Sequence, residues 1–406
     1  MSRAVTLIIV LSIWALFHLW VARRLILRGT EYPVWARRTI AGAVVAIYLV
    51  PILGFLGPRM GLFDAHRGVL PWVAFVFMGV GTLLVALTIA VDVPRMIAQA
   101  SLAVRRYLFE RRKADAAEAA AASEAPSSMD RRRFFADVAN YGIVGGAVGL
   151  SSVGFAAARR VPRVVEVDVA IADLHPDLEG LRIAQLSDVH VGPTIRGTWL
   201  DQVVEATNAL APDLVALTGD FVDGFVEQLG PELGGLGRLE ATHGVFFVTG
   251  NHEYYWDGPA WCEHVASLGP TVLINEHRIV ERGAARLLVA GVPDLHVERH
   301  VPKLRSDPAA AKADAPAHDL SLLLAHQPRS IYAAAEAGFD LQLSGHTHAG
   351  QYFPGSLLIY LAQPYVRGLS RHGDSQIYVS AGTGYWGPPN RAGSPSEITL
   401  LRLVRA

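Results

Sequence analysis

Side chains that commonly bind divalent metal ions stand at the ends of three short apolar runs. The runs are 181–186, 214–218 and 245–249, and they are followed by Asp188-Val189-His190, Gly219-Asp220 and Gly250-Asn251-His252. Short apolar runs that stop abruptly are typical of strands buried on both faces. Because neighbouring parallel strands end at one edge of a sheet, we expect these side chains to converge there. The pattern predicts a cluster of metal ions at that edge.

Two later motifs extend the expected ligand set. His326 follows the apolar run 320–324, and His346 and His348 follow the run 341–343. The mixture of carboxylate, amide oxygen and imidazole suits Mn²⁺, Fe²⁺ or Zn²⁺, and no thiolate is present to build a structural zinc site. The expected ligands are Asp188, His190, Asp220, Asn251, His326, His346 and His348. They exceed what one ion with open positions needs, so we expect two ions that share one carboxylate.

A pair of metal ions suits the chemistry of phosphate esters. Two ions about 3.5–4 Å apart can hold a bridging hydroxide and stabilise both oxygens of an in-line displacement. An anionic phosphate needs this help because it repels a nucleophile. A general acid must also protonate the leaving oxygen, and His252, next to Asn251, is the natural candidate. The sequence thus favours hydrolysis of phosphate ester or pyrophosphate bonds by a metal-bridging hydroxide.

The motifs together resemble those of the calcineurin-like metallophosphoesterase superfamily. The amino-acid sequences of the segments 187–192, 219–224, 250–255 and 343–351 resemble its membrane-anchored or twin-arginine-exported bacterial branch. The resemblance covers about residues 160–406, with Ala349 standing where that branch often has Gly. It implies an α/β domain built as a four-layer αββα sandwich. It also implies that Asp188, His190 and His348 hold the first metal, that Asn251, His326 and His346 hold the second, that Asp220 bridges them and that His252 donates the proton.

Other residues are candidates for binding the substrate. Asp223 and Tyr254 lie close to the motifs and either line the pocket or serve only their own loops. The tail 380–391 is expected to shape the rim of the site, where Arg391 either meets a substrate phosphate or is an ordinary surface arginine. Taken one at a time, Asp188 and Asp220 are also compatible with helix N-caps, and His326 with a buried structural histidine.

From Val164 onward the hydrophobic pattern predicts alternating strands and helices. Strands are expected at 165–171, 181–186, 214–218, 245–249, 272–274, 287–291, 320–324, 341–343, 377–379 and 398–403. Helices are expected at 198–210, 231–239, 259–268 and 329–337. The polar, Pro- and Ala-rich segment 301–316 is expected to be a surface loop.

The first part of the chain is expected to lie in a membrane. The apolar stretches 4–22, 39–56 and 69–91 are each long enough to cross a bilayer. Arginines crowd the segment between the first two stretches and the segment after the third, which places both in the cytoplasm. Arg131-Arg132-Arg133-Phe134-Phe135 and the Gly/Ala-rich stretch 141–158 resemble an internal twin-arginine signal. If this stretch is a fourth transmembrane helix, the chain after Arg159 lies outside the cytoplasm. Two alternatives are a helix that lies on the membrane surface, which leaves the domain in the cytoplasm, and cleavage after Ala158, which releases the domain.

The expected regions are three transmembrane helices in 1–94, a basic and Ala-rich cytoplasmic linker in 95–135, a fourth membrane or twin-arginine-like segment in 136–160 and the phosphoesterase domain in 161–406. A net charge of −1 gives no reason to expect nucleic acid. The expected protein is a multi-pass cell-membrane enzyme whose catalytic domain lies outside the cytoplasm, and whose partners are the membrane and a phosphorylated small-molecule or lipid-linked substrate. The alternative is a non-catalytic membrane sensor or scaffold that retains the fold.

Overall fold

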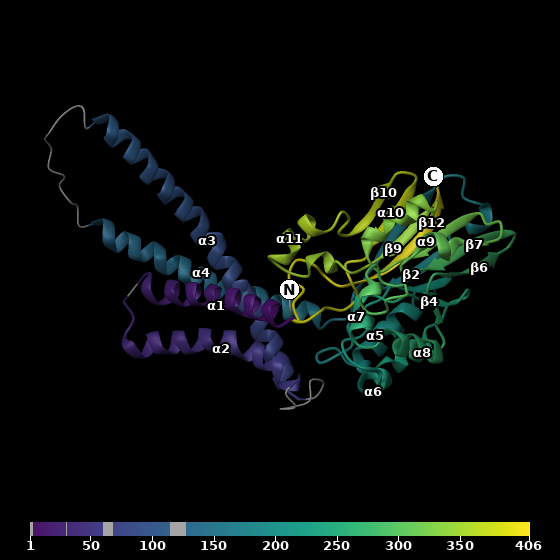
Figure 1. Ribbon diagram of the computed structural model, residues 1–406, viewed down its shortest axis with the longest axis horizontal. Helices are drawn as coiled ribbons and strands as arrows, with labels where there is room; N and C mark the ends of the chain where they lie inside the picture. Colours follow the sequence, from purple (N-terminus) through teal and green to yellow (C-terminus); the bar gives the residue numbers. More distant parts are fainter. Residues whose placement is uncertain (1–2, 30, 60–67, 114–126) are drawn as a thin grey trace. The chain divides into compact units, whose positions relative to one another are not determined.

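A computed structural model describes residues 3–29, 31–59, 68–113 and 127–406. The chain divides into two compact units, one made of 1–63 with 73–152 and the other of 64–72 with 153–406. The first unit is helical, and the second contains the β-sheets (Figure 1).

The helical unit contains α1 (Arg3–Leu27), α2 (Val34–Arg59), α3 (Leu70–Lys113) and most of α4 (Ser127–Ala158). All four helices are long and apolar enough to cross a membrane. The stretches 4–22, 39–56 and 141–158 fall inside them, and so does 69–91 except for Val69. The expected linker 95–135 is helical up to Lys113 and again from Ser127, and its part 114–126 lies outside the described residues.

A buried carboxylate links α1 to α3. Asp92 is fully buried and accepts hydrogen bonds from the guanidinium of Arg24, from Arg28 Nη1 at 2.7 Å and from Trp20 Nε1 at 3.1 Å. Arg24 is itself 1% exposed. A buried charge is tolerated only when it is paired and hydrogen-bonded, so this contact fixes the packing of the two helices.

Two mixed six-stranded sheets form the centre of the second unit. In spatial order, the first contains β1 (Arg163–Ile171), β12 (Glu397–Arg405), β2 (Arg182–Leu186), β3 (Leu214–Leu217), β4 (Val245–Phe247) and β5 (Thr271–Val272). The second contains β10 (Gly368–His372), β11 (Ser375–Val379), β9 (Leu341–Ser344), β8 (Leu320–Leu324), β7 (Ala285–Gly291) and β6 (Glu276–Arg282). Strands β2 to β5 run parallel, as do β7, β8, β9 and β11, so each set ends at one edge.

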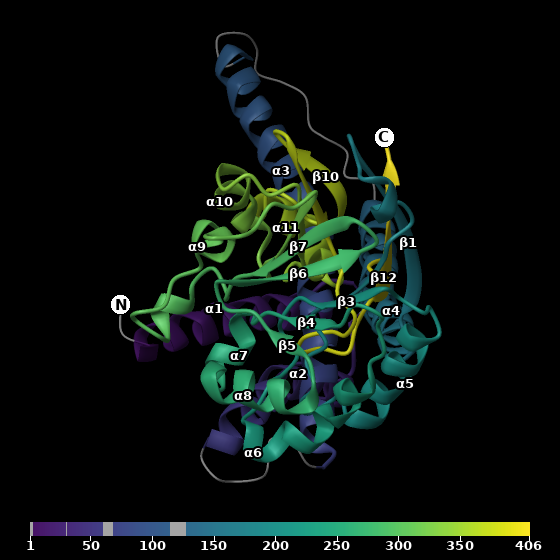
Figure 2. The same ribbon diagram turned by 90° about the vertical axis from the view of Figure 1, so that its right-hand side faces the viewer.

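The two sheets pack face to face, with helices on both outer faces. In β3, Leu214 and Ala216 enter the core between the sheets, whereas Val215 and Leu217 enter a second core beneath helices. Those helices are α5 (Gly197–Asn208), α6 (Val226–Leu229) and α8 (Gly258–Leu268); α9 (Pro308–Lys312) and α10 (Ile331–Glu336) cover the second sheet (Figure 2). The expected four-layer αββα sandwich is confirmed.

Some expected elements differ from the structure. The segment 301–316 contains α9, whose Pro308 and Ala311 are buried, so it is more than a surface loop. The expected helix 231–239 is a 3₁₀ helix over Gly230–Arg238, a segment rich in glycine, which disfavours a regular α-helix. The sequence pattern missed β6, β10 and the helices α7 (Asn251–Tyr255) and α11 (Gly355–Ala362).

Polar contacts connect the two sheets at the edge where the predicted ligands lie. Gln185, at the end of β2, is fully buried, and its Nε2 donates to Thr218 Oγ1 and to the Ser344 carbonyl, both at 2.9 Å. His326 Nδ1 donates to the Thr218 carbonyl at 2.8 Å. Since Ser344 and His326 belong to the second sheet's side of the core, these bonds hold the two sheet edges in register.

We expect Gln185→Met to destabilise the protein by about 1–3 kcal/mol, because it keeps the side-chain volume but removes the buried hydrogen bonds that Nε2 donates to Thr218 Oγ1 and to the Ser344 carbonyl. Thermal unfolding of the detergent-solubilised full-length protein measures the change. Gln228→Met, at an exposed glutamine of α6, is the matched control and should stay within about 0.5 kcal/mol of the parent. Equal melting of the two variants would contradict the role given to Gln185.

Candidate metal centre

The predicted ligands come together at the strand ends of both sheets. Two groups of three predicted ligands have their ligand atoms within 4.8 Å of one another: Asp188, His190 and His348 form one, and Asp220, His326 and His346 form the other. A third group within the same distance joins His190 and Asp220 to His252. Within these groups, His190 Nε2 lies 3.1 Å from His348 Nε2, and His346 Nδ1 lies 3.2 Å from His326 Nε2. Imidazole nitrogens that face each other at this distance are the arrangement expected around a shared cation.

Asp220 lies between the two groups. Its Oδ2 is 3.0 Å from His326 Nε2 and 3.9 Å from His190 Nε2, so one oxygen faces a ligand of each group. Its Oδ1 accepts a hydrogen bond from the His252 backbone N–H at 2.8 Å. Burial by itself raises the pKa of Asp220, but His326 and His252 outweigh it and hold the pKa well below its usual value. The ionised carboxylate is therefore available to two cations at once.

Five of the candidate ligand residues have a left-handed backbone. Asp188, His190, Asp220, His346 and His348 have φ between 49° and 69°, a region that non-glycine residues rarely adopt and that costs of order 1 kcal/mol or more each. Backbone strain of this kind persists only where surrounding contacts impose it. It turns each side chain away from the strand direction and towards its partners.

Close backbone approaches support the two carboxylates. The His346 backbone N–H lies 3.0 Å from both oxygens of Asp188, and Ser187 Oγ donates to Asp188 Oδ2 at 2.6 Å. A Cβ at Gly345 would collide with Asp188, and one at Gly250 would collide with Asp220. Glycine at these positions lets the loops of both sheets close on the site.

Glu253 anchors the loop that carries Asp220. Its two oxygens accept hydrogen bonds from the backbone N–H groups of Asp220 at 3.0 Å, Phe221 at 2.6 Å and Gly250 at 2.7 Å. Burial first, and then the charge of Asp220, raise the pKa of this carboxyl. No role for Glu253 was expected from the sequence, although its position three residues after Gly250 is a capping signature that pointed to it.

His252 forms a pair with Asp223. Its Nδ1 lies 2.5 Å from Asp223 Oδ1, and its Nε2 lies 3.9 Å from Asp220 Oδ2. Burial lowers the pKa of His252, but Asp220 and Asp223 outweigh it and raise the pKa to about 9. The imidazole is thus held in its protonated form, with Nε2 turned to the centre. Asp223, one of the expected pocket residues, acts on His252 in this way.

The expected rim position of Arg391 is wrong. The side chain is 1% exposed, and it donates to the carbonyls of Ala381 at 2.8 Å and His348 at 3.0 Å, while Nη2 lies 3.0 Å from His348 Nδ1. Burial first, and then the cationic Arg391, lower the pKa of His348 and keep its ring neutral, the form that binds a metal. Arg391 therefore orients a candidate ligand instead of meeting substrate.

Tyr254, a candidate for substrate binding, takes instead the loop role that the sequence also allowed. It is 6% exposed, and its hydroxyl accepts a hydrogen bond from Thr249 Oγ1 at 3.1 Å, so it serves its own loop. The neighbouring Tyr255 is half exposed and its hydroxyl accepts a hydrogen bond from Asn251 Nδ2 at 3.2 Å. One residue along a helix turns a side chain by about 100°, and the sequence does not show which tyrosine faces outward.

The donor set fits divalent metal ions. Within the described part of the chain, the buried Asn251 Oδ1 has no hydrogen-bond donor, which is costly unless a cation binds it. Burial first, and then His326, lower the pKa of His346 and keep it neutral. Burial lowers the pKa of His326, but Asp220 outweighs it and raises the pKa to about 10, so the surroundings of this imidazole favour positive charge.

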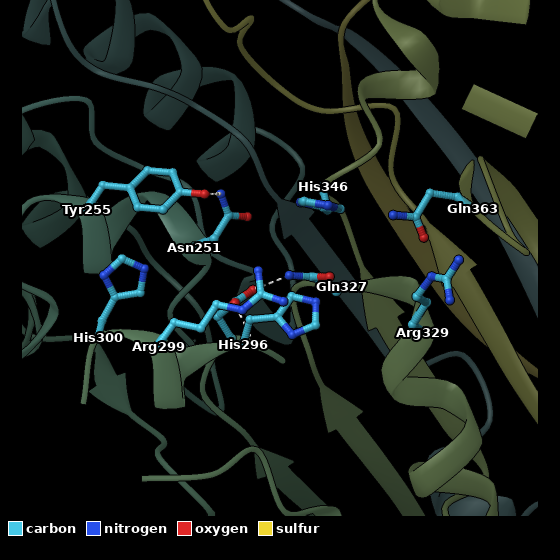
Figure 3. A pocket seen from close by; sticks show the side chains of 10 residues that line it. Asn251, Tyr255, His296, Arg299, His300, Gln327, Arg329, His346 and Gln363 are labelled. Atoms are coloured by element: carbon cyan, nitrogen blue, oxygen red, sulfur yellow. Dashed lines mark hydrogen bonds between the residues drawn. The ribbon is translucent and has the colours of Figure 1, made fainter. Parts of the chain in front are cut away.

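A pocket of about 310 Å³ opens beside Asn251 and His346 (Figure 3). Tyr255, His296, Arg299 and His300 lie on one side of it, and Arg329 and Gln363 lie on the other. The buried Asp294 accepts from Gln327 Nε2 at 2.7 Å and from the His296 backbone at 2.9 Å. Two guanidinium groups and several imidazoles make the pocket suitable for an anion.

We expect Glu253→Gln to lower the affinity for Mn²⁺ by roughly 10–100-fold, which is the usual effect of losing hydrogen bonds that support metal ligands. The amide retains one acceptor oxygen but points an N–H₂ group at a backbone donor. Calorimetric titration of the full-length protein with Mn²⁺ measures the change. Glu263→Gln, at an exposed glutamate of α8, is the matched control. An unchanged Mn²⁺ affinity in Glu253→Gln would show that this carboxylate does not position the centre.

The chain matches known proteins across this site. The family model described as "Calcineurin-like phosphoesterase" matches residues 181–350, the segment that carries all the candidate ligands. The "Transmembrane protein with metallophosphoesterase domain" of Danio rerio is 38% identical over 265 residues, which cover 63% of this chain and 61% of that protein.

Bacterial relatives show the same likeness. An "Uncharacterized metallophosphoesterase" of Helicobacter pylori is 41% identical over 248 residues, covering 60% of this chain and 64% of that protein. The match thus spans about three fifths of the length of these first relatives. Another from Aquifex aeolicus is 32% identical over 225 residues, covering 55% of this chain and 85% of that protein. With the two-sheet fold and the strand-end cluster of aspartates and histidines, these matches show that the chain belongs to the calcineurin-like metallophosphoesterase family.

Proposed function

We propose that this protein is a membrane-anchored phosphoesterase that hydrolyses phosphate ester or pyrophosphate bonds with two divalent metal ions. Mn²⁺ is the first candidate, with Fe²⁺ and Zn²⁺ as alternatives. The observation that carries the proposal is the position of Asp220, whose Oδ2 faces ligand atoms of both groups. Bound ions would supply Lewis-acid chemistry: they acidify water and neutralise charge on the phosphoryl oxygens.

The chain's own residues divide the remaining work. Asp188, His190 and His348 would hold one ion, Asn251, His326 and His346 the other, and Asp220 both. The acid is His252, which Asp223 keeps protonated and oriented. From that position Nε2 can give its proton to the leaving oxygen as the phosphorus–oxygen bond breaks.

The surroundings of the centre favour a substrate with a membrane-linked leaving group. Arg299 and Arg329 give the adjacent pocket a positive lining, four helices can cross a bilayer, and the Danio rerio relative is named a transmembrane protein. We therefore propose a lipid-linked phosphate ester or diphosphate as the substrate. The twin-arginine-like segment 131–135 favours a domain that lies outside the cytoplasm.

The function is tested with the full-length protein in detergent, assayed with Mn²⁺ against a chromogenic phosphodiester and monoester. Hydrolysis should require the metal, stop on addition of a chelator and fall to background in Asp220→Asn, because the shared ligand weakens at both ions. Chelator-resistant hydrolysis would contradict a metal-dependent reaction. Two bound ions with no hydrolysis of any phosphate ester would instead favour a sensor or scaffold.

We expect His252→Ala to lower kcat by about 10²–10⁴-fold, the usual contribution of a general acid, while two metal ions stay bound. His318→Ala, at a half-buried histidine outside the site whose Nδ1 contacts the Pro316 carbonyl, should retain the parent kcat. Rates and metal content are measured on the same preparations. Loss of metal from His252→Ala would overturn its assignment as the acid.

A further inference from the structure

Helix α11 exposes an apolar surface that nothing in the described part of the domain covers. Its sequence, GSLLIYLA, has no charged residue and no buried residue. Leu357, Leu358, Tyr360 and Leu361 are 65%, 55%, 61% and 85% exposed, and Ile359 packs on a small cluster of Ala349, Val366 and Ala381. A surface helix normally turns polar residues outward. This helix turns apolar residues both inward and outward.

Exposure of these side chains has a free-energy cost unless something covers them. Burial of leucine side chains is favourable in proportion to the apolar area removed from water, and clustered exposed apolar groups mark interaction sites. The charged residues close to α11 in the sequence are also all basic. No aspartate or glutamate occurs from Gly345 to His372, whereas Arg367 and Arg371 follow the helix and are exposed. The surface is therefore apolar with a cationic border.

Two exposed aromatic residues accompany this surface. Tyr360 is in the helix, and Trp386, which is 50% exposed and whose ring lies 5.6 Å from that of His252, has its backbone N–H and carbonyl bound to the side chain of Gln351, shortly before α11. Tyrosine and tryptophan favour the level of the lipid headgroups, where an apolar ring can also keep its polar atom hydrated. Exposed leucines, bordering aromatic rings and arginines are the composition of a helix that lies in a membrane interface.

We propose that α11 inserts its leucines into the lipid bilayer and holds the mouth of the pocket at the bilayer surface. A bilayer is the occupant favoured by the chain itself, because four of its helices can span one and only residues 159–162 separate α4 from β1. The border of arginines suits anionic headgroups, because basic side chains close to an anionic lipid surface are attracted to it.

Helix α11 adjoins the pocket beside the metal centre. Gln363, directly after α11, lines the pocket, and so does Arg329, whose Nη2 donates to the Ala362 carbonyl at 2.8 Å (Figure 3). A phosphate ester anchored by acyl chains can therefore enter from the membrane with its headgroup towards Arg329. This step rests on the proposed function, whereas insertion of α11 does not.

Insertion is measured by attaching an environment-sensitive fluorophore to Leu361→Cys in a Cys262→Ser background of the full-length protein. The protein is reconstituted in vesicles of phosphatidylcholine and phosphatidylglycerol that carry doxyl-labelled lipid. The control is Glu281→Cys in β6, an exposed position at the opposite edge of the second sheet from β10. We expect strong quenching at 361 and little at 281. A fluorophore at 361 that the lipid does not quench and that aqueous iodide does would overturn the proposal.

A second measurement tests the consequence for substrates. Leu358→Ser with Leu361→Ser should lower hydrolysis of phosphatidic acid in vesicles by roughly tenfold, since the loss of two inserted leucines weakens the hold of the pocket on the bilayer surface, and should leave a water-soluble chromogenic ester unaffected. Equal rates on phosphatidic acid, or equal losses on both substrates, would contradict the role of α11. If the parent hydrolyses neither substrate, the proposed function fails and the quenching result alone decides whether α11 inserts.

Discussion

Two buried carboxylates set the main physical constraint on this structure. Asp188 and Asp220 are 0% and 2% exposed, and an ionised carboxylate in such surroundings is stable only with positive charge and hydrogen bonds around it. Imidazoles from both sheets meet this need in part, and the paired nitrogens and the orphaned oxygen of Asn251 leave room for cations. A metal centre follows from the electrostatics of the site as well as from its likeness to a family.

The centre depends on the contact between the two sheets. Asp188 and Asp220 follow strands of the first sheet, whereas His326 and His346 follow strands of the second. Hydrogen bonds from Gln185 and His326 hold the two edges together, and left-handed backbone at the ligands turns their side chains inward. Core packing therefore stabilises a strained site that the separate loops could not maintain.

The sequence predicted most of the site because ligand chemistry and buried strands leave strong local signals. Apolar runs such as 320–324 identify parallel strands, and a polar residue directly after such a run stands at the sheet edge. The side chains' directions were not predictable. Arg391 turns inward to His348, and Tyr254 turns inward where Tyr255 turns outward, because these orientations depend on tertiary contacts. Polar strands such as β6 give weak hydrophobic patterns and were missed.

We propose that two metal ions share Asp220. The most direct measurement is the metal content of the full-length protein after equilibration with Mn²⁺ and removal of free ions, by elemental analysis against protein concentration. We expect about two ions per chain and a substantial loss in Asp220→Asn, since that substitution weakens a ligand of both ions. A parent protein that holds no ion, or an Asp220→Asn variant that still holds two, would contradict it.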